Sequence, residues 1–226
     1  MSEIIKEMKN VLVINSSART VRSQSRKLTE VFVARWKGVH THPEITFREL
    51  GNTDVPHIDE HWINAAFKSE AYRSDEEIEA LKMSDLYISE LKKADIIVLG
   101  SPMYNWSIPS ALKAYIDQVV RVNETWKRNP DDIQNPYIGL LQNKTVFLLL
   151  SRGAQGYEKG EYNEHIDFQT DYLKRVFNVM GIRHIHVVTV NGESFDADKY
   201  KMSISAAHRK IVELIDTSAV EETSSS

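Results

Sequence analysis

The sequence predicts a doubly wound α/β fold, in which a five-stranded parallel sheet of strand order 2-1-3-4-5 carries helices on both faces. Short apolar runs alternate along the chain with segments whose apolar residues recur at helical spacing. Three of the runs are continuous rather than alternating, which is typical of parallel strands that are covered on both faces. The five predicted strands are residues 11–15, 45–50, 95–100, 145–151 and 184–190.

Each predicted helix shows apolar residues three or four positions apart, as one buried face requires. The clearest stripe is Leu112, Tyr115, Ile116 and Val119, which follow the spacing i, i+3, i+4, i+7. Gly181 is a typical helix stop, because glycine readily adopts the left-handed conformation at a helix C-terminus. The other stripes are Leu28, Val31, Phe32 and Trp36; Ile78, Leu81, Ile88 and Leu91; Leu173, Val176, Phe177 and Met180; and Ile204, Ala207, His208, Ile211 and Ile215.

The chain is expected to form one domain, because no linker rich in proline, glycine or serine divides it and no repeat is visible. We assign residues 10–217 to this domain, residues 1–9 to an N-terminal extension and residues 218–226 to a disordered tail. Two longer connections, residues 51–74 and 122–144, are read as loops. Loops of this length in a compact domain are usually functional or mobile.

Composition excludes several classes of function. The 226 residues carry a formal net charge of −4, which predicts no general affinity for nucleic acid or anionic membranes. No stretch reaches the roughly 18 apolar residues of a membrane span, and the N-terminus has no signal-peptide core. The chain has no cysteine, which excludes disulfides, thiol nucleophiles and thiolate metal sites. These features favour a cytoplasmic protein without a membrane or nucleic-acid partner.

Polar residues with anion-binding character follow the first strand, just before a predicted helix. The unpaired N–H groups and the positive dipole end of a helix N-terminus favour phosphate, and hydroxyl side chains add donors. The alternative is that Ser23 or Ser25 only caps the helix. The segment lies at the switch point between strands 1 and 3, which favours phosphate binding. Its members are Ser16, Ser17, Arg19, Arg22, Ser23, Gln24 and Ser25.

The third strand ends in the sequence SPMYNW, an unusual composition for a turn. A connection that only reverses direction uses glycine, asparagine, aspartate or serine. An apolar side chain, two aromatic rings and an amide at this position are typical of a ligand platform. Because ligands of such sheets bind beyond the carboxyl ends of the strands, Met103, Tyr104, Asn105 and Trp106 are expected to line the binding crevice.

A third segment, SRGAQG, follows the fourth predicted strand. Ser151, Arg152, Gly153 and Gly156 could bring backbone N–H groups close to a planar polar ring; the alternative is a flexible loop with two turn glycines. If the three strand ends converge, they combine a hydroxyl-rich anion site, an aromatic platform and a glycine loop. A flat, phosphorylated cofactor would use all three, and flavin mononucleotide (FMN) fits that description.

These motifs resemble those of the FMN-dependent NADH:quinone oxidoreductases of the azoreductase family, over about residues 10–215. The stretch PMYNWSIPSALKAYIDQVVR is close to the family pattern P-M-Y-N-F-x-I-P/S-x-x-L-K-x-Y-x-D, and SRGAQG matches its S-R-G-G loop. Ala154 and Trp106 stand where the family usually has glycine and phenylalanine, and residues 51–74 match only loosely. By position, the implied cofactor-binding residues are Ser17, Ser23, Gln24, Ser25, Pro102, Met103, Tyr104, Asn105, Trp106, Ser151, Arg152, Gly153 and Ala154.

The resemblance implies a flavodoxin-like fold and a ping-pong reaction, in which NADH or NADPH and then a quinone or azo compound use the same site. Two electrons pass through one FMN per subunit, and no side chain is expected to act as a catalyst. The resemblance also implies a homodimer with each site at the interface, and we place Trp106 and Trp126 in the substrate pocket. Two alternatives stay open: a flavodoxin-type single-electron carrier, and a binding module without redox turnover.

No metal site is expected. The segment HIDEH at residues 57–61 spaces two histidines at i, i+4, which on a helix could bind a metal, but it follows a proline in a segment without helical pattern. His184 and His186 share one face of a strand without further ligands nearby in the sequence, and a structural role is expected for them.

Overall fold

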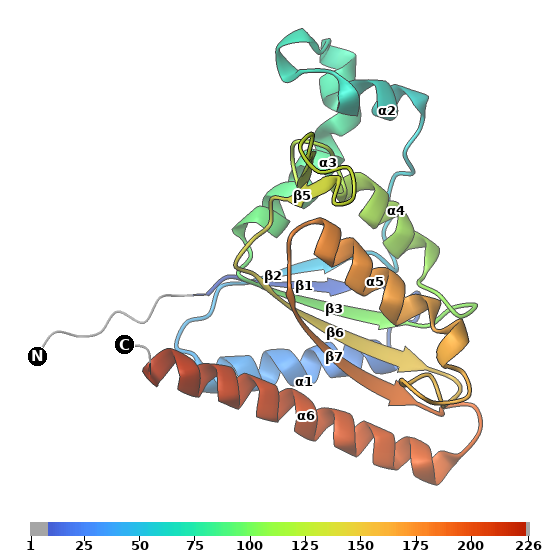
Figure 1. Cartoon of the computed structure of the whole chain (residues 1–226). Helices are drawn as coiled ribbons and strands as arrows, with labels where there is room; N and C mark the ends of the chain where they lie inside the picture. Colours follow the sequence, from blue (N-terminus) through green and yellow to red (C-terminus); the bar gives the residue numbers. More distant parts are fainter. Residues whose placement is uncertain (1–8, 225–226) are drawn as a thin grey trace, which may run out of the picture.

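The computed structural model describes residues 9–224 and shows a central parallel sheet between two layers of helices (Figure 1). The order of the five strands is β2-β1-β3-β6-β7. Numbered among themselves along the chain, these strands have the order 2-1-3-4-5, so the predicted fold class is confirmed. The strands are β1 Val11–Asn15, β2 Ile45–Glu49, β3 Ile96–Pro102, β6 Thr145–Arg152 and β7 His184–Asn191.

The continuous apolar runs are explained by the two faces of the sheet. In β1, Leu12 and Ile14 belong to a core cluster on one face, whereas Val11 and Val13 belong to a cluster on the other face. All four side chains are at most 2% exposed. Because side chains alternate along a strand, a strand that is covered on both sides needs an apolar residue at every position.

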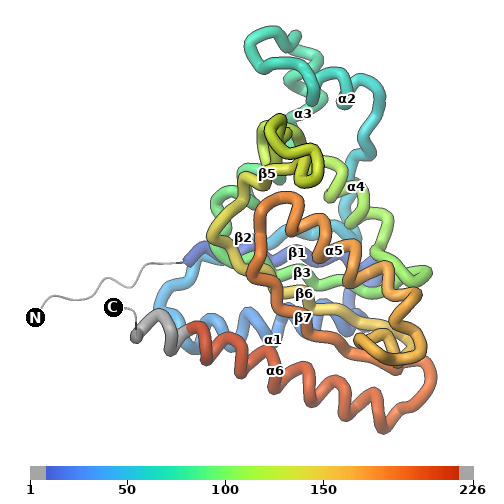
Figure 2. The backbone as a smooth tube through the Cα atoms, in the orientation of Figure 1, coloured from blue at the N-terminus to red at the C-terminus, as the bar shows by residue number. Residues whose placement is uncertain are grey.

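In the described part of the chain, the outer layers are formed by helices at the positions that the apolar stripes predict. Helices α1 Gln24–Val39 and α6 Ala197–Ser224 cover one face. Helices α3 Asp75–Lys93, α4 Ser110–Val119 and α5 Phe168–Val179 cover the other (Figure 2). The stripe on α4 is buried throughout. Ile78 is an exception, since it is 51% exposed at the start of α3.

The interpretation of residues 51–74 as a loop is wrong, because they contain helix α2 Glu60–Phe67 and the 3-10 helix η1 Glu70–Tyr72. Asp59 caps α2 by accepting a hydrogen bond from the Trp62 N–H at 2.8 Å. Trp62 and Ala65 then pack against Leu81 of α3 in a small separate core. Helix α2 and the start of α3 project beyond the sheet (Figure 1). Eight residues show too little periodicity to reveal a helix that depends on such tertiary contacts.

Residues 122–144 are also more ordered than a loop, since they form a hairpin of β4 Trp126–Arg128 and β5 Tyr137–Gly139. The base of this hairpin packs against the turn after α5. A Cβ atom added to Gly139 would lie 2.1 Å from the backbone nitrogen of Gly181, so the two backbones are in direct contact. Leu141 also donates its N–H to the carbonyl of Met180 at 2.8 Å.

The end of the domain differs from the expected disordered tail at 218–226, because α6 continues to Ser224. Ser218 contributes to this continuation, since its hydroxyl donates to the carbonyls of Leu214 and Ile215. Residues 1–8 of the expected N-terminal extension and residues 225–226 lie outside the described residues. In the part of the chain that is described, no helix has the length and apolar character needed to cross a membrane.

Candidate active site

The three predicted segments meet at the carboxyl edge of the sheet, where the strand arrows end in Figure 1. Strands β1, β3 and β6 are neighbours, and their ends are joined by backbone hydrogen bonds. The Ser16 N–H donates to the Gly100 carbonyl at 3.0 Å, and the Met103 N–H donates to the Ser151 carbonyl at 2.8 Å. The structure therefore brings together the residues after β1, β3 and β6, as the strand order predicts.

The segment after β1 forms a compact group of buried polar side chains, which we call the anion cup: Ser17, Ser23, Gln24 and Ser25. Ser23 is the N-cap of α1 and accepts a hydrogen bond from the Arg26 N–H at 3.3 Å. The hydroxyls of Ser23 and Ser25 lie 3.2 Å apart. Capping and anion binding are compatible, because the N-terminus of an α-helix has four N–H groups without partners in the helix and Ser23 occupies only one of them.

Gln24 supports the prediction of an oxygen-rich ligand at the anion cup. Its Oε1 accepts a hydrogen bond from the Tyr200 hydroxyl at 3.3 Å. Its Nε2 is buried and has no hydrogen-bond partner among the described residues. A buried donor without an acceptor is costly, and a phosphate or ribityl oxygen would supply the missing acceptor. The residues present therefore fit the phosphorylated end of FMN.

Arg26 shapes the cup and was missed in the sequence. Its guanidinium forms hydrogen bonds with both carboxylate oxygens of Glu49, and it also donates to the carbonyls of Ser17 and Arg19, each at 2.8 Å. Burial opposes ionisation of Glu49, but the hydrogen bonds from Arg26 and from the Gly51 N–H outweigh it, so the pKa of Glu49 lies below its usual value. No local sequence pattern indicates the Arg26–Glu49 pair, because most of α1 and β2 lies between the two residues in the sequence.

Gly100 allows the start of α1 to approach the sheet. A Cβ atom at this position would lie 2.7 Å from the Thr29 side chain and 3.0 Å from the Ser25 carbonyl. Any side chain at residue 100 would therefore push the first turns of α1 away from β3. The glycine keeps the anion cup close to the segment after β3.

Residues Tyr104–Ser107 form a turn with unusual backbone geometry, which we call the aromatic turn. Tyr104 and Ser107 exchange two backbone hydrogen bonds of 3.0 Å each. The two central residues, Asn105 and Trp106, have φ angles of +49° and +63°. Positive φ at both positions defines a type I′ turn, which usually contains asparagine and glycine. For a bulky residue such as Trp106, this conformation costs on the order of 1–3 kcal/mol and is found mainly at functional sites.

The strained turn presents Trp106 to the outside. This side chain is 54% exposed, whereas Met103 and Tyr104 before it are partly buried. An exposed aromatic ring on a strained turn contributes little to the core. The geometry therefore favours a role of Trp106 in contacting a ligand over a role in packing beneath the turn.

The segment Ser151–Ala154, which we call the glycine loop, contacts the loop after β7. The Ser194 N–H donates to the Gly153 carbonyl at 3.0 Å, and the Gly192 N–H donates to the carbonyls of Arg152 and Ala154. The carbonyls of Arg152, Gly153 and Ala154 are occupied by these bonds, and Gly153 and Ala154 carry no long side chain that would keep a ligand away from the backbone. This arrangement suits contacts with the polar edge of a planar ring.

The side chain of Arg152 points away from the crevice and is 2% exposed. It forms an ion pair with Asp167 at 2.8 Å and hydrogen bonds with Gln169 and Thr170 at the start of α5. Burial lowers the pKa of Arg152, and the carboxylates of Asp167 and Glu158 oppose that shift. The guanidinium thus fastens α5 to the end of β6, and only the backbone of Arg152 is placed to meet a cofactor.

Trp126 does not lie with the other predicted site residues of the same chain. Helix α4 leads from the carboxyl edge back toward the start of the strands, and Trp126 follows it in β4. There its ring packs edge-on against Tyr137, with 5.2 Å between ring centroids. The sequence alone does not show at which end of the sheet residue 126 lies, because it does not show where α4 ends relative to the strands.

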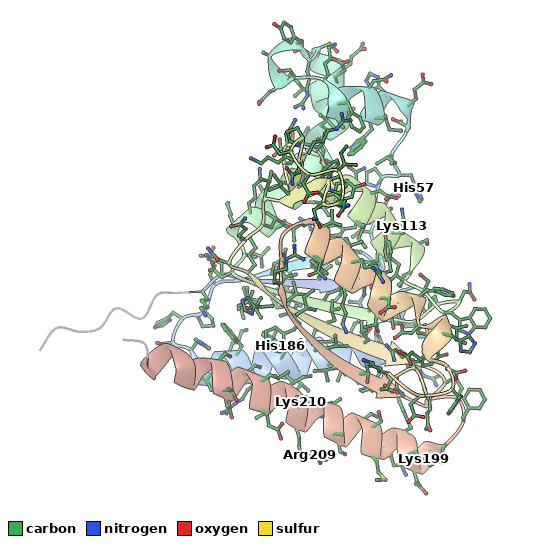
Figure 3. All side chains as sticks on the ribbon, in the orientation of Figure 1. His57, Lys113, His186, Lys199, Arg209 and Lys210 are labelled. Atoms are coloured by element: carbon green, nitrogen blue, oxygen red, sulfur yellow. The ribbon has the colours of Figure 1, made fainter. Side chains whose placement is uncertain are left out.

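The segment at residues 57–61 does not form a single helix that would place both histidines on one face. Asp59 caps α2, and His61 lies within that helix, while His57 precedes it (Figure 3). Among the described residues, no group of three or more histidine, aspartate or glutamate side chains is placed to hold a metal ion.

Comparison with known proteins agrees with the geometry. The family model of the flavodoxin-like fold matches residues 9–215, which is most of the chain. The chain belongs to this flavodoxin-like family. A member from Trichormus variabilis, named FMN-dependent NADH:quinone oxidoreductase 1, is 39% identical over 208 residues, which cover 92% of this chain and 96% of the relative. The resemblance seen in the sequence motifs is thereby confirmed.

Two further proteins that are similar to this chain extend the comparison. A protein from Pseudomonas aeruginosa, named FMN-dependent NAD(P)H:quinone oxidoreductase 1, is 33% identical and covers 92% of this chain and 98% of its own length. The crystal structure of an azoreductase from Bacillus anthracis str. Sterne aligns with a TM-score of 0.83 at 26% identity. This alignment covers 93% of this chain and all of that structure.

Proposed function

We propose that this flavodoxin-like protein is an FMN-dependent oxidoreductase that uses NADH or NADPH to reduce quinones and azo compounds. The observation that carries the proposal is the convergence of three unlike surfaces at one sheet edge: a buried hydroxyl cup, an exposed aromatic turn and a glycine loop. This combination fits a planar, phosphorylated cofactor. The names of the relatives from Trichormus variabilis and Pseudomonas aeruginosa support the same activity.

When bound, FMN would supply two-electron redox chemistry that links hydride donation from NAD(P)H to reduction of the acceptor in a ping-pong sequence. The anion cup would hold the phosphate and ribityl end through hydroxyls, the first-turn N–H groups and Gln24 Nε2. The aromatic turn and the glycine loop would contact the ring system. Arg26 and Glu49 would keep the cup in shape without touching the cofactor.

Substrate selection is assigned to Trp106. Its ring is 54% exposed on a turn whose geometry is fixed by two backbone hydrogen bonds. A rigid, exposed ring beside the cofactor can stack on the planar nicotinamide and, in the other half of the reaction, on a planar quinone or azo compound. No side chain is assigned as an acid or base.

We also propose a homodimer, because apolar side chains are exposed on residues 51–74 and on residues 122–144, the two long connections between strands and helices of the domain. Phe67 and Tyr72, on α2 and η1, are 65% and 76% exposed, and Ile133 and Tyr137 of the hairpin are 91% and 56% exposed. Exposed apolar patches mark interfaces, and twofold symmetry is the commonest arrangement. Association through the hairpin would give Trp126 a place near the partner's site, which the single chain does not provide.

The decisive experiment begins with the colour of the purified protein. A yellow protein that bleaches on addition of NADH supports the proposal, and steady-state assays with quinones and azo dyes, with both nicotinamides, define the substrates. A colourless protein that cannot be loaded with FMN would contradict it and favour a binding module. Turnover that required a protein acceptor would favour a single-electron carrier. Light scattering that gave the monomer mass of 25.9 kDa for fully active protein would refute the dimer.

The absence of cysteine suits a reducing compartment, and we propose the cytoplasm as the location of the protein.

A further inference from the structure

A cavity adjoins the glycine loop and is separate from the three convergent segments. It has a volume of about 880 Å³ and lies between residues 155–162 and one side of α6. Its wall begins at Gln155 and Gly156, directly after Ala154. A volume of this size is typical of a small-molecule site. Neither the fold nor the proposed cofactor site accounts for it.

The helix wall of this cavity is cationic. Lys199, Met202, Ala206 and Arg209 recur at helical spacing and line one side of the cavity. Among the side chains that the structure describes, Arg209 has no hydrogen-bond or ion-pair partner. Lys199 forms only a long, exposed pair with Asp196, at 3.7 Å. Both cations are therefore available to an anionic group, and guanidinium suits phosphate particularly well.

The loop wall offers an aromatic ring and carboxylates. Tyr162 packs against Gly156, where an added Cβ atom would lie 2.5 Å from the ring, and the side chain is still 68% exposed. Glu158 is engaged with Asn191 at 2.7 Å and with Arg152 at 3.7 Å. Glu161 is exposed on the same wall. Carboxylates accept hydrogen bonds from ribose hydroxyls, and an exposed ring face can stack on a base.

From these walls we infer that the cavity binds the adenosine monophosphate half of the nicotinamide dinucleotide donor. This inference rests on the proposed function, because it assigns a place to the part of NADH that does not react. The adenine base would stack on the ring of Tyr162, and the ribose hydroxyls would bind the carboxylates of the loop wall. The phosphate would bind the cations of the helix wall. The cavity wall begins at Gln155, directly after the glycine loop that is proposed to contact the cofactor ring, so one molecule could contact both.

The test compares NADH with reduced nicotinamide mononucleotide, which carries the same hydride but lacks the adenosine monophosphate half. The FMN-loaded enzyme is assayed with both donors and one quinone. In the variant Arg209→Ala, the ratio of kcat/KM for NADH to that for the mononucleotide should fall about tenfold, the scale of one charge-assisted hydrogen bond. The matched control is Lys210→Ala, because Lys210 is the next residue on α6 (Figure 3) but pairs with Glu213 and does not line the cavity.

A second variant, Ala206→Glu, and a binding measurement test the inference independently of the Arg209→Ala substitution. Ala206→Glu places a carboxylate on the helix wall at an exposed position, and it should lower the same ratio while the melting temperature stays unchanged. Adenosine monophosphate should bind the oxidised holoenzyme in calorimetry and inhibit competitively against NADH. Both effects should weaken in Arg209→Ala.

The outcomes separate the two proposals. The inference would be overturned if turnover were normal and the ratio of kcat/KM for NADH to that for the mononucleotide were equal in Arg209→Ala, Lys210→Ala and the unaltered enzyme. The proposed function would then still stand. Noncompetitive inhibition by adenosine monophosphate would also overturn it, because the cavity would then bind a separate nucleotide. Failure of the loaded protein to oxidise either donor would overturn the proposed function together with the inference.

Discussion

Arg26, in the first turn of α1, forms hydrogen bonds with both carboxylate oxygens of Glu49 at the end of β2. The same guanidinium donates to the carbonyl of Ser17, so the pair connects the outer strand of the sheet to the anion cup. The Arg26 guanidinium is occupied by Glu49 and by the carbonyls of Ser17 and Arg19. Their effect on binding must therefore act through the shape of the segment after β1.

Glu49→Gln should weaken FMN binding although Glu49 does not line the cup. The neutral amide cannot accept both hydrogen bonds from Arg26, and the carbonyls of Ser17 and Arg19 should then be held less firmly. We expect the dissociation constant of FMN to rise about three- to tenfold, the equivalent of one hydrogen bond. The measurement is a fluorescence titration of the apoprotein with FMN.

The neighbouring pair Arg48–Glu90 supplies a matched control, because it joins β2 to α3 with a similar bidentate geometry. Glu90→Gln should lower the melting temperature to a comparable degree and leave the FMN affinity unchanged. Equal effects of the two variants on FMN affinity would show that Glu49 acts only through general stability.

FMN retention should depend on acid pH through Glu49. Because the pKa of Glu49 in the folded protein lies below its usual value, the carboxylate is harder to protonate when folded than when unfolded. Its contribution to stability is therefore complete above the ordinary range of glutamate and is lost as the pH falls through the folded-state pKa. FMN release on acid titration should begin at higher pH in the Glu49→Gln variant, which already lacks this contribution. Superimposable release curves would contradict this role.

Combined replacement of Ser23 and Ser25 by alanine should reduce FMN affinity at least tenfold. Each hydroxyl is expected to contribute a hydrogen bond to a charged group, worth roughly 1.5–3 kcal/mol. Because Ser23 is also an N-cap, some loss of stability, about 1 kcal/mol, accompanies the change. Ser74→Ala is the control for that loss, since Ser74 caps α3 in a capping box far from the cup in the sequence. An unchanged dissociation constant in the double variant would remove the anion cup from the cofactor site.

Substitutions of Trp106 should separate substrate selection from backbone strain. Trp106→Ala should change KM or kcat for planar acceptors several-fold, because a stacking ring contributes about 0.5–1.5 kcal/mol beyond its buried area. Trp106→Gly should show the same kinetic change but melt at a higher temperature than the alanine variant. Glycine adopts the φ angle of +63° without the cost of roughly 1–2 kcal/mol that other residues meet.

The control for exposure is Phe47→Ala, because Phe47 is 57% exposed on β2 and lies outside the site. It should alter neither KM nor kcat. If Trp106→Ala lowered the melting temperature and spared the kinetics, the ring would be a packing residue after all.

Much of the architecture could be predicted because it follows from local patterns in the sequence. A run such as VLVIN at 11–15 indicates a strand covered on both faces. The alternation of strands with helical stripes predicts a parallel sheet, for which 2-1-3-4-5 is a common order of five strands. That order alone places Ser17, Met103 and Gly153 at one edge of the sheet. The composition of the aromatic turn predicts a ligand platform at that edge.

Other features depend on contacts between distant residues and left no local signal. No local pattern indicated that Arg26 pairs with Glu49, or that the side chain of Arg152 would bind Asp167 and fasten α5. Helix α2 needs the ring of Trp62, whose Nε1 donates to Gln118 of α4 at 2.8 Å. The left-handed conformation of Trp106 contradicts its intrinsic preference, which is expected where function outweighs local stability.

The contact between Gly139 and Gly181 sets limits on how the protein can be redesigned. At the base of the hairpin, two backbones touch with no space for a methyl group, so neither glycine can change without moving β5 away from the turn after α5. The far end of the hairpin has no such constraint, since Ile133 is 91% exposed and Asp132 is occupied only with the backbone of Gln134 and with Asn135. Insertions, purification tags or fluorescent labels between residues 131 and 135 should therefore leave the fold of the single chain intact and interfere only with the proposed dimer contact of Ile133, whereas a single methyl group added to Gly139 or Gly181 should disturb the fold itself.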